Sequence, residues 1–438
     1  MPKDDGLSYL LYETRMSEAN PFDAPPPEPA PQNGARFTGN ERAFWRLLIR
    51  GAILLLVTLG IYRFWLATDV RRFLWSNTEV AGDGLEYIGT ARELLLGFLI
   101  AIALLVPINV AFFLAAFSRG VIGQISGLLA LAALALLGQF AVYRARRYRL
   151  TRTVYRGIRF HQTGSAWRYA VCAIFWWGMI ALTLGLAYPF AQASLERFKL
   201  RNTYYGDLQG HFVGSGTRLF FRGVLFWLAV MGPFAFGLMM AIGAVDWTAV
   251  GEAMRRGGDD VMGRIEAAGV APALVVAVLS FGWSVAAAAV LYPAFQAMVL
   301  RWWISGLRFG ELSVASTLRT RAVYAVYLRF MWIALLAGVV VAIALVITLA
   351  LIGGLEVWLG KGRVTELLTT AFLISTYVIV ALAYSTIYQA TVKIRLWKAG
   401  FESIELSGLE ALVRVSAAGA PGSAVGEGLA DALNVGGI

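Results

Sequence analysis

The chain has 438 residues, of which 58% are hydrophobic and only 15% are charged. A soluble domain is about half apolar and about one quarter charged, so water is not the main solvent of this protein. The net charge of +11 does not indicate nucleic acid as a partner. The lysines and arginines lie mostly between apolar segments, where positive charge orients helices and meets anionic headgroups.

The two ends of the chain differ from its middle. The first 36 residues are polar and rich in proline, and they lack the apolar core of a signal peptide. We therefore expect a disordered, proline-rich cytoplasmic tail over 1–36 and a membrane domain over 37–406. A flexible tail rich in glycine and alanine is expected over 407–438.

Eight apolar windows occupy the membrane domain, and each is long enough to cross a bilayer. Inside hydrocarbon every backbone amide needs an internal partner, so helices are expected and open sheet edges are not. The sequence therefore predicts an all-α polytopic membrane protein with 6–8 transmembrane helices. The windows are 44–67, 94–117, 120–142, 167–191, 219–245, 269–295, 324–352 and 367–390.

Two of the windows, 44–67 and 167–191, contain the same Thr-Leu-Gly sequence, beginning at Thr58 and at Thr183. If all eight windows span, the two halves become inverted repeats of the kind found in transporters. If these two windows instead enter the membrane and return, six spans remain and most basic loops gather on the inner side. We prefer the second arrangement, because it satisfies the positive-inside rule far better.

Internal repeats connect the loops between windows. The stretch 38–78 is similar to 163–203, and 147–168 is similar to 197–218. Each unit places an arginine beside an aromatic residue at a helix exit, then Asn-Thr or an equivalent pair, then a glycine turn. We interpret the shared polar and glycine residues as structural, because they suit a helix end followed by a turn. They are Asn77, Thr78, Asn202, Thr203, Gly206 and Gly214.

The repeated basic residues are the candidate binding residues. Guanidinium groups at headgroup depth are suited to phosphate, although ordinary snorkelling of arginine needs no ligand. Two histidines occupy equivalent repeat positions and can titrate near neutral pH or serve as structural residues. The candidates for binding an anionic headgroup or a partner are Arg72, Arg147, Arg197, Arg301, His161 and His211.

Enzymatic function is not expected. The sequence has no phosphate-binding loop, no zinc-protease motif and no serine-hydrolase motif, so we predict no catalytic residue, no cofactor and no metal site. Cys172 is the only cysteine, which excludes a disulfide within one chain. The window interiors lack the acidic or histidine side chains that a proton-driven pump requires.

The segments 198–207 and 211–214, together with 37–39 and 71–73, resemble the YjgN family of bacterial inner-membrane proteins. This resemblance implies a multi-pass protein of the inner membrane and a family of unknown function. The sequence thus predicts a non-enzymatic protein that engages anionic phospholipid headgroups or another membrane protein. The alternative is a passive or exchange transporter built from inverted repeats.

Overall fold

The computed structural model describes residues 34–118, 120–257, 261–360, 362–418 and 431. Most of these residues are helical, and ten short strands form a single antiparallel sheet. The tail expected over 1–36 lies almost wholly outside the described residues.

Each strand of the sheet pairs with its neighbours in chain order, from β1 to β10. A bridge between Gly34 and Glu405 then joins the first strand to the last, so the sheet closes into a ring. The strands are β1 (Ala35–Phe37), β2 (Thr78–Val80), β3 (Asp83–Tyr87), β4 (Thr153–Tyr155), β5 (Ile158–Gln162), β6 (Thr203–Tyr205), β7 (Leu208–Phe212), β8 (Leu307–Phe309), β9 (Leu312–Ser316) and β10 (Ile404–Ser407).

Side chains from opposite parts of this ring meet in its interior. Tyr155 and Tyr205 belong to one buried cluster with Val314 and Leu406, which lie on strands far from them in the sheet order. The hydroxyl of Tyr155 donates to the carbonyl of Val80 at 2.8 Å, and that of Tyr205 donates to the carbonyl of Tyr155 at 3.0 Å. The ring is therefore filled by side chains, and the buried hydroxyls are satisfied.

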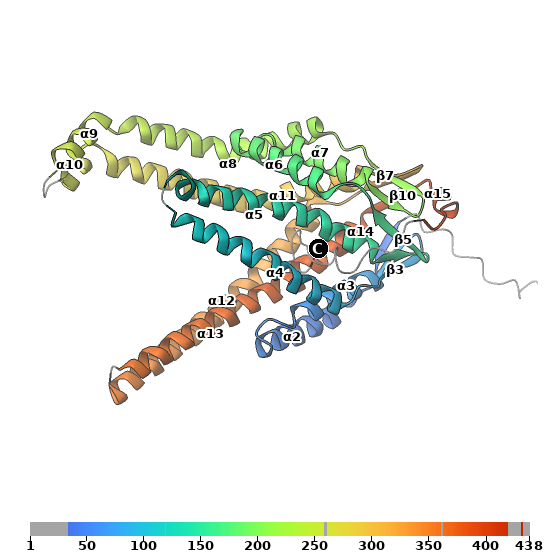
Figure 1. Cartoon of the computed structure of the whole chain (residues 1–438), viewed down its shortest axis with the longest axis horizontal. Helices are drawn as coiled ribbons and strands as arrows, with labels where there is room; N and C mark the ends of the chain where they lie inside the picture. The colour runs from blue at the N-terminus through green and yellow to red at the C-terminus, as the bar shows by residue number, and fades with distance from the viewer. Residues whose placement is uncertain (1–33, 119, 258–260, 361, 419–430, 432–438) are drawn as a thin grey trace, which may run out of the picture.

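Three long helical hairpins extend from the ring toward the same side and spread apart (Figure 1). They are α4 (Ala91–Ala116) with α5 (Val121–Thr151), α8 (Gly216–Ala244) with α11 (Val270–Ser305), and α12 (Thr320–Leu359) with α13 (Arg363–Tyr388). The last hairpin returns to the ring through a π-helical turn, η1 (Gln389–Lys393), and α14 (Ile394–Glu402). The tip of the second hairpin carries α9 (Trp247–Arg256) and α10 (Val261–Ala267).

Two shorter hairpins complete the set. They are α2 (Glu41–Val57) with α3 (Arg63–Ser76), and α6 (Ala166–Leu182) with α7 (Tyr188–Arg201). Each is divided at its Thr-Leu-Gly sequence, where Leu59 and Leu184 have φ of 50° and 49° and the glycines that follow have φ of 91° and 96°. The windows 44–67 and 167–191 are therefore broken helices, as we expected for the re-entrant arrangement.

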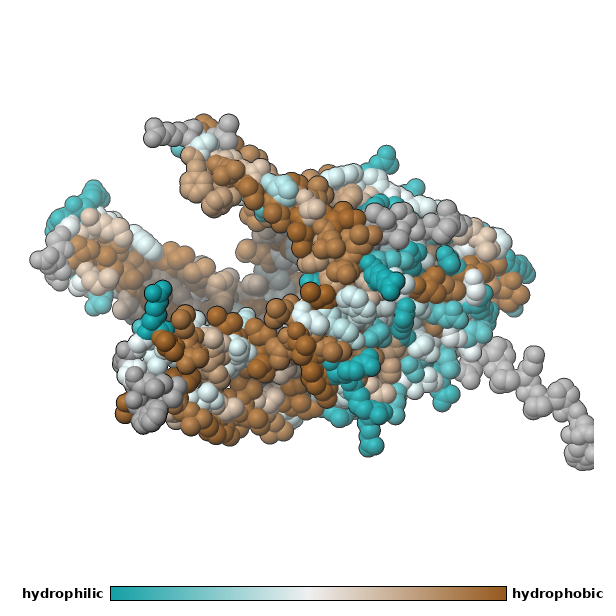
Figure 2. All heavy atoms as spheres, turned by 60° about the horizontal axis from the view of Figure 1, so that its bottom comes forward, coloured by the Kyte–Doolittle hydropathy of each residue, from teal (hydrophilic) through white to brown (hydrophobic). Residues whose placement is uncertain are grey.

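Six helices of the described chain are long and apolar enough to cross a membrane. At most 11% of each apolar window is buried within the protein, so their hydrophobic side chains face outward, as lipid contact requires. Figure 2 shows apolar residues covering these helices and hydrophilic residues gathered toward the strands. The six are Ala91–Ala116, Gly123–Thr151, Gly216–Ala244, Val270–Ser305, Thr320–Gly354 and Arg363–Glu402.

Two expectations need correction. The all-α class omits the sheet, because strands of three to five residues are too short to produce a recognisable alternation of apolar and polar residues. Part of the segment expected to be a flexible tail, 407–438, instead packs on the ring. It forms α15 (Glu410–Val413), and Ser416 bonds to the carboxylate of Asp207. Most of its remainder lies outside the described residues.

Candidate functional site

The four arginines predicted to bind headgroups share one backbone contact. Each lies near the end of a helix that enters the ring, and each donates a hydrogen bond from Nη to the carbonyl found 17 residues later, just before the next helix. The pairs are Arg72 with Gly89 at 3.0 Å, Arg147 with Gly164 at 2.6 Å, Arg197 with Gly214 at 3.4 Å, and Arg301 with Leu318 at 3.0 Å. These arginines tie the two helices on either side of a β-hairpin together.

The Asn-Thr pairs lie at helix ends. The amide of Asn77 donates to the carbonyl of Phe73, and the amide of Asn202 makes the equivalent bond to Phe198, both at 2.7 Å. The hydroxyls of Thr78 and Thr203 each bond to a carbonyl four residues earlier, also at 2.7 Å. Such bonds satisfy helical carbonyls that have no intrahelical partner.

The two repeat glycines lie in turns around the strand pair that follows Asn202. Gly206 has φ of +57° between β6 and β7, a conformation that glycine adopts without strain. Gly214 precedes α8, and a Cβ there would meet the ring of Phe212 at 2.4 Å. Both positions favour glycine for reasons of backbone and packing.

The structure does not bring the two histidines together, and their surroundings differ. His161 on β5 stacks on the ring of Tyr204, with centroids 5.0 Å apart. Burial lowers the pKa of His161, and its buried Nδ1 has no hydrogen-bond partner among the described residues. His211 on β7 is exposed, and its backbone pairs with Arg308.

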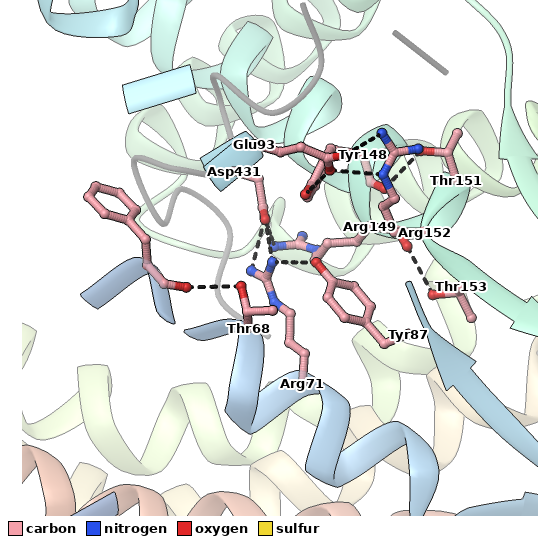
Figure 3. Close-up of polar contacts among 11 residues, drawn as sticks. Thr68, Arg71, Tyr87, Glu93, Tyr148, Arg149, Thr151, Arg152, Thr153 and Asp431 are labelled. Carbon is pink, nitrogen blue, oxygen red and sulfur yellow. Dashed lines mark hydrogen bonds and ion pairs between the residues drawn. The ribbon is translucent and has the colours of Figure 1, made fainter. Parts of the chain in front are cut away.

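A buried ionic cluster lies between α3 and α5 (Figure 3). The carboxylate of Asp431 is fully buried and is held by both Nη atoms of Arg71, which is 3% exposed. Nη1 of Arg149 donates to the same carboxylate at 3.1 Å. Nη1 of Arg71 also donates to the hydroxyl of Tyr87 at 3.1 Å. Two arginines on two helices thus enclose one acidic group from the C-terminal part of the chain.

Further basic side chains surround this cluster. Arg146 on α5, Lys199 on α7 and Lys393 on η1 lie within Coulombic range of Arg149, Arg146 and Arg71, respectively. Glu196 supplies the other nearby carboxylate and pairs with Lys199. Burial lowers the pKa of Lys199, and the charges of Arg146 and Arg149 add to the lowering while Glu196 opposes it. Among the described residues, the cluster therefore holds more basic groups than carboxylates.

The pKa of Arg71 reflects the same arrangement. Burial alone lowers it, but the Asp431 carboxylate and the Tyr87 hydroxyl favour the charged form strongly enough that the net shift is upward. Charged arginine is thus stabilised by its partners despite its removal from water.

A neighbouring ionic group joins α4 to α5. Glu93 accepts from the hydroxyl of Tyr148 at 2.8 Å and from Nε of Arg152 at 3.0 Å (Figure 3). Arg152, which stands where the next repeat has Asn202, therefore has a different partner. This group connects the start of one long helix to the end of its partner.

A different set of arginines is exposed at the helix starts. Each of the five helices that leave the ring has an exposed arginine as its second or third residue. These residues are Arg42 in α2, Arg92 in α4, Arg168 in α6, Arg218 in α8 and Arg321 in α12. The predicted binding residues lie at the helix exits and do not include these entries, although an arginine within three residues of the start of each corresponding apolar window is itself a signal.

Arg71 and Asp431 were also missed. The double arginine at 71–72 gave no indication that the first residue is buried and the second exposed. Asp431 lies in a segment of small residues without a recognisable motif, so no sequence signal marked it.

One comparison with known proteins gives a match. The family model described as "Bacterial protein of unknown function (DUF898)" matches residues 32–432. No curated protein and no solved structure matches the chain. The match includes every strand and every candidate spanning helix of the described chain, and YjgN belongs to this family, so the resemblance expected from the motifs is confirmed. The chain belongs to the DUF898 family of bacterial proteins of unknown function.

Proposed function

We propose that this protein is a non-enzymatic, multi-pass protein of the bacterial inner membrane that engages anionic phospholipid headgroups. The observation that carries the proposal is the exposed arginine at the start of every helix leaving the ring. The apolar helices begin here, so these guanidinium groups would lie at headgroup depth.

Two physical effects act together at these positions. The first turn of a helix has unpaired N–H groups and a partial positive charge, both of which favour an anion. In α6 and α8 the Ser165 and Ser215 side chains occupy one such N–H each, and the arginine follows three residues later. A phosphodiester beside Arg168 or Arg218 would face both the guanidinium and the helix end.

The repeated arginines at the helix exits have a lesser part in this proposal. Arg72, Arg147, Arg197 and Arg301 each commit an Nη group to a backbone carbonyl. Their recurrence is explained by this structural bond without a ligand. Another membrane protein would bind through the same basic surface. This alternative is to be tested if the protein shows no preference for anionic lipid.

The transporter alternative depended on inverted halves, and the sheet argues against them. Inversion would put the β2–β3 pair and the β6–β7 pair on opposite sides of the bilayer. The two pairs belong to one sheet, linked through β4 and β5. A sheet of short strands would have to pass through the bilayer to join its two faces, and this supports a common side for the equivalent loops.

The proposal is tested with spin-labelled lipids. In membranes of phosphatidylcholine and phosphatidylglycerol, we expect the wild-type protein to associate preferentially with spin-labelled phosphatidylglycerol. The Arg168→Gln/Arg218→Gln variant should lose much of this preference, measured by electron spin resonance as the ratio of association constants. The preference should also weaken as salt is added, because exposed charges are screened.

A matched control removes the same charge elsewhere. Arg36 and Arg159 are exposed on strands β1 and β5, away from the helix starts, so Arg36→Gln/Arg159→Gln should keep the preference. Equal association of the two lipids with the wild-type protein would rule out headgroup selectivity. An equal loss in both double variants would show that net charge, and not the helix starts, is responsible.

A further inference from the structure

Among the described residues, the buried cluster at Asp431 contains more basic groups than carboxylates. Arg71, Arg146, Arg149, Lys199 and Lys393 meet two carboxylates there, those of Glu196 and Asp431, among the described residues. Buried charge is strongly unfavourable unless it is paired. Nε of Arg71 and Nε of Arg146 are buried and have no hydrogen-bond partner among the described residues.

The two arginines that hold Asp431 are positioned by the rest of the fold. Arg71 precedes Arg72, whose bond to Gly89 fixes the end of α3. Nε1 of Trp75, one turn further along α3, donates to the hydroxyl of Thr153 at 3.0 Å and so connects α3 to β4. Arg149 lies in the last turns of α5, which continues into that strand. The arrangement of donors therefore depends on the ring and its helices.

Asp431, in contrast, comes from a distant part of the sequence, 360 residues after Arg71. Its carboxylate receives two Nη atoms of Arg71 and one of Arg149. This convergent arrangement of guanidinium donors is the one that proteins use for carboxylate and phosphate groups. A carboxylate has one negative charge, whereas a phosphate monoester or inorganic phosphate can bring two and would neutralise the cluster better.

We infer that the space between α3 and α5 is a binding site for a phosphate dianion, which Asp431 occupies as an intrachain substitute. The site is separate from the exposed arginines at the helix starts. Arg71 and Arg149 contact the group that occupies the site, and the Tyr87 hydroxyl contacts Arg71. Arg146 and Lys199 supply additional positive charge. Phosphate binds only those molecules in which Asp431 does not occupy the site. The apparent affinity for phosphate is therefore the intrinsic affinity multiplied by the fraction of such molecules.

The test uses the full-length protein in phosphatidylcholine nanodiscs, with inorganic phosphate as the probe and calorimetry as the measurement. Asp431→Asn keeps the shape of the side chain and removes its charge. It should bind phosphate about tenfold more tightly than the wild-type protein, or more. Glu427→Gln, which removes a carboxylate four residues earlier in the sequence, is the matched control and should bind as the wild-type protein does. Adding Arg149→Gln to Asp431→Asn should abolish the gain.

A thermal measurement separates a binding site from a purely structural ion pair. Phosphate should raise the melting temperature of Asp431→Asn and should leave that of the Asp431→Asn/Arg149→Gln variant unchanged. If Asp431→Asn melts lower and neither inorganic phosphate nor phosphatidic acid raises its melting temperature, Asp431 is a structural residue and the inference is overturned. Binding of inorganic phosphate with the same measurable affinity to the wild-type protein, Asp431→Asn and the double variant overturns it as well.

A second arm identifies the source of the phosphate. The nanodiscs are prepared with phosphatidic acid, whose headgroup is a phosphate monoester, and the lipid retained after purification is measured. Retention that rises in Asp431→Asn and depends on Arg149, without binding of inorganic phosphate, assigns the site to a lipid headgroup. Binding of inorganic phosphate alone assigns it to a soluble anion. Absence of both results overturns the inference.

Discussion

Adjacent arginines on the same helix have different environments in this protein. Arg71 is buried against Asp431, whereas Arg72 is exposed and bonds to a backbone carbonyl. On α5, Arg147 likewise bonds to a carbonyl, while its neighbour Arg146 lies among the charges of the buried cluster. Consecutive helical residues point in directions about 100° apart, so one of each pair supports the fold and the other faces the cluster.

His161 should make stability depend on pH. Its pKa is lowered by burial from the ordinary value of 6.5, so the unfolded chain binds more protons near and below that pH. The free energy of unfolding should therefore be fully retained above pH 6.5 and should fall as pH decreases below it. In His161→Gln the melting temperature should decrease less between pH 7.5 and pH 5.5 than in the wild-type protein.

His211 provides the comparison for this measurement. It is exposed at the equivalent repeat position, so His211→Gln should keep the pH dependence of the wild-type protein. Identical pH profiles for the wild-type protein and His161→Gln would show that proton binding by the half-buried imidazole does not influence stability. The comparison concerns the slope with pH, because loss of the stacking on Tyr204 changes stability at every pH.

Among the elements, the short hairpins are built around one turn that occurs twice. In the second, the hydroxyl of Thr183 donates to the carbonyl of Met179 and accepts from the backbone N–H of Ala187. Thr58 makes the same two bonds in the first hairpin. Nε1 of Trp227 on α8 donates to the carbonyl of Leu184 at 2.8 Å, so the second turn is also fastened to a long helix.

Gly185 should be required by its backbone conformation. Its φ is 96°, and the nearest atom to an added Cβ is 3.6 Å away, so substitution meets backbone strain and not a clash. Gly185→Ala should lower the free energy of unfolding in detergent by about 1–2 kcal/mol. Gly178→Ala is the control: it lies within α6 with open space around it and should be neutral or stabilising by about 0.5–1 kcal/mol. Equal effects at both positions would contradict the strained turn.

The sequence is informative about these elements to different degrees. Helices are predictable because lipid demands long apolar segments. The breaks at Thr58 and Thr183 were predictable because the same Thr-Leu-Gly sequence occurs in both windows, and because the basic loops gather on one side only if these windows do not span. The ring is not predictable in the same way. Strand β2 has three residues; β3 follows it after a two-residue turn, but its other partner, β1, is brought to it by the helices α2 and α3 that lie between them in the chain. The information that specifies the sheet lies in these long-range pairings.

For the whole molecule, the ring determines the direction of every helix pair. β1 near the start of the described chain and β10 near its end complete the circle through the bridge at Gly34 and Glu405. Each β-hairpin receives one helix and releases the next, so all strands lie at one end of the molecule (Figure 1). The polar ends of all five helical pairs consequently share one face, and the positive charge accumulates there.

This geometry predicts the sidedness of three positions. In a Cys172→Ser background, single cysteines at Thr163 and Val213 stand on equivalent, exposed connections after β5 and β7, and a membrane-impermeant maleimide should reach both from the same side. A cysteine at Glu252 in α9 should be reached from the opposite side. The α8 helix has 29 residues and is therefore about 43 Å long, enough to cross a bilayer. Labelling of positions 163 and 213 from opposite sides of the membrane would instead support the transporter built from inverted repeats. Labelling of position 252 from the same side as the other two would show that α8 and α11 do not cross, because α9 connects them at the far end from the ring.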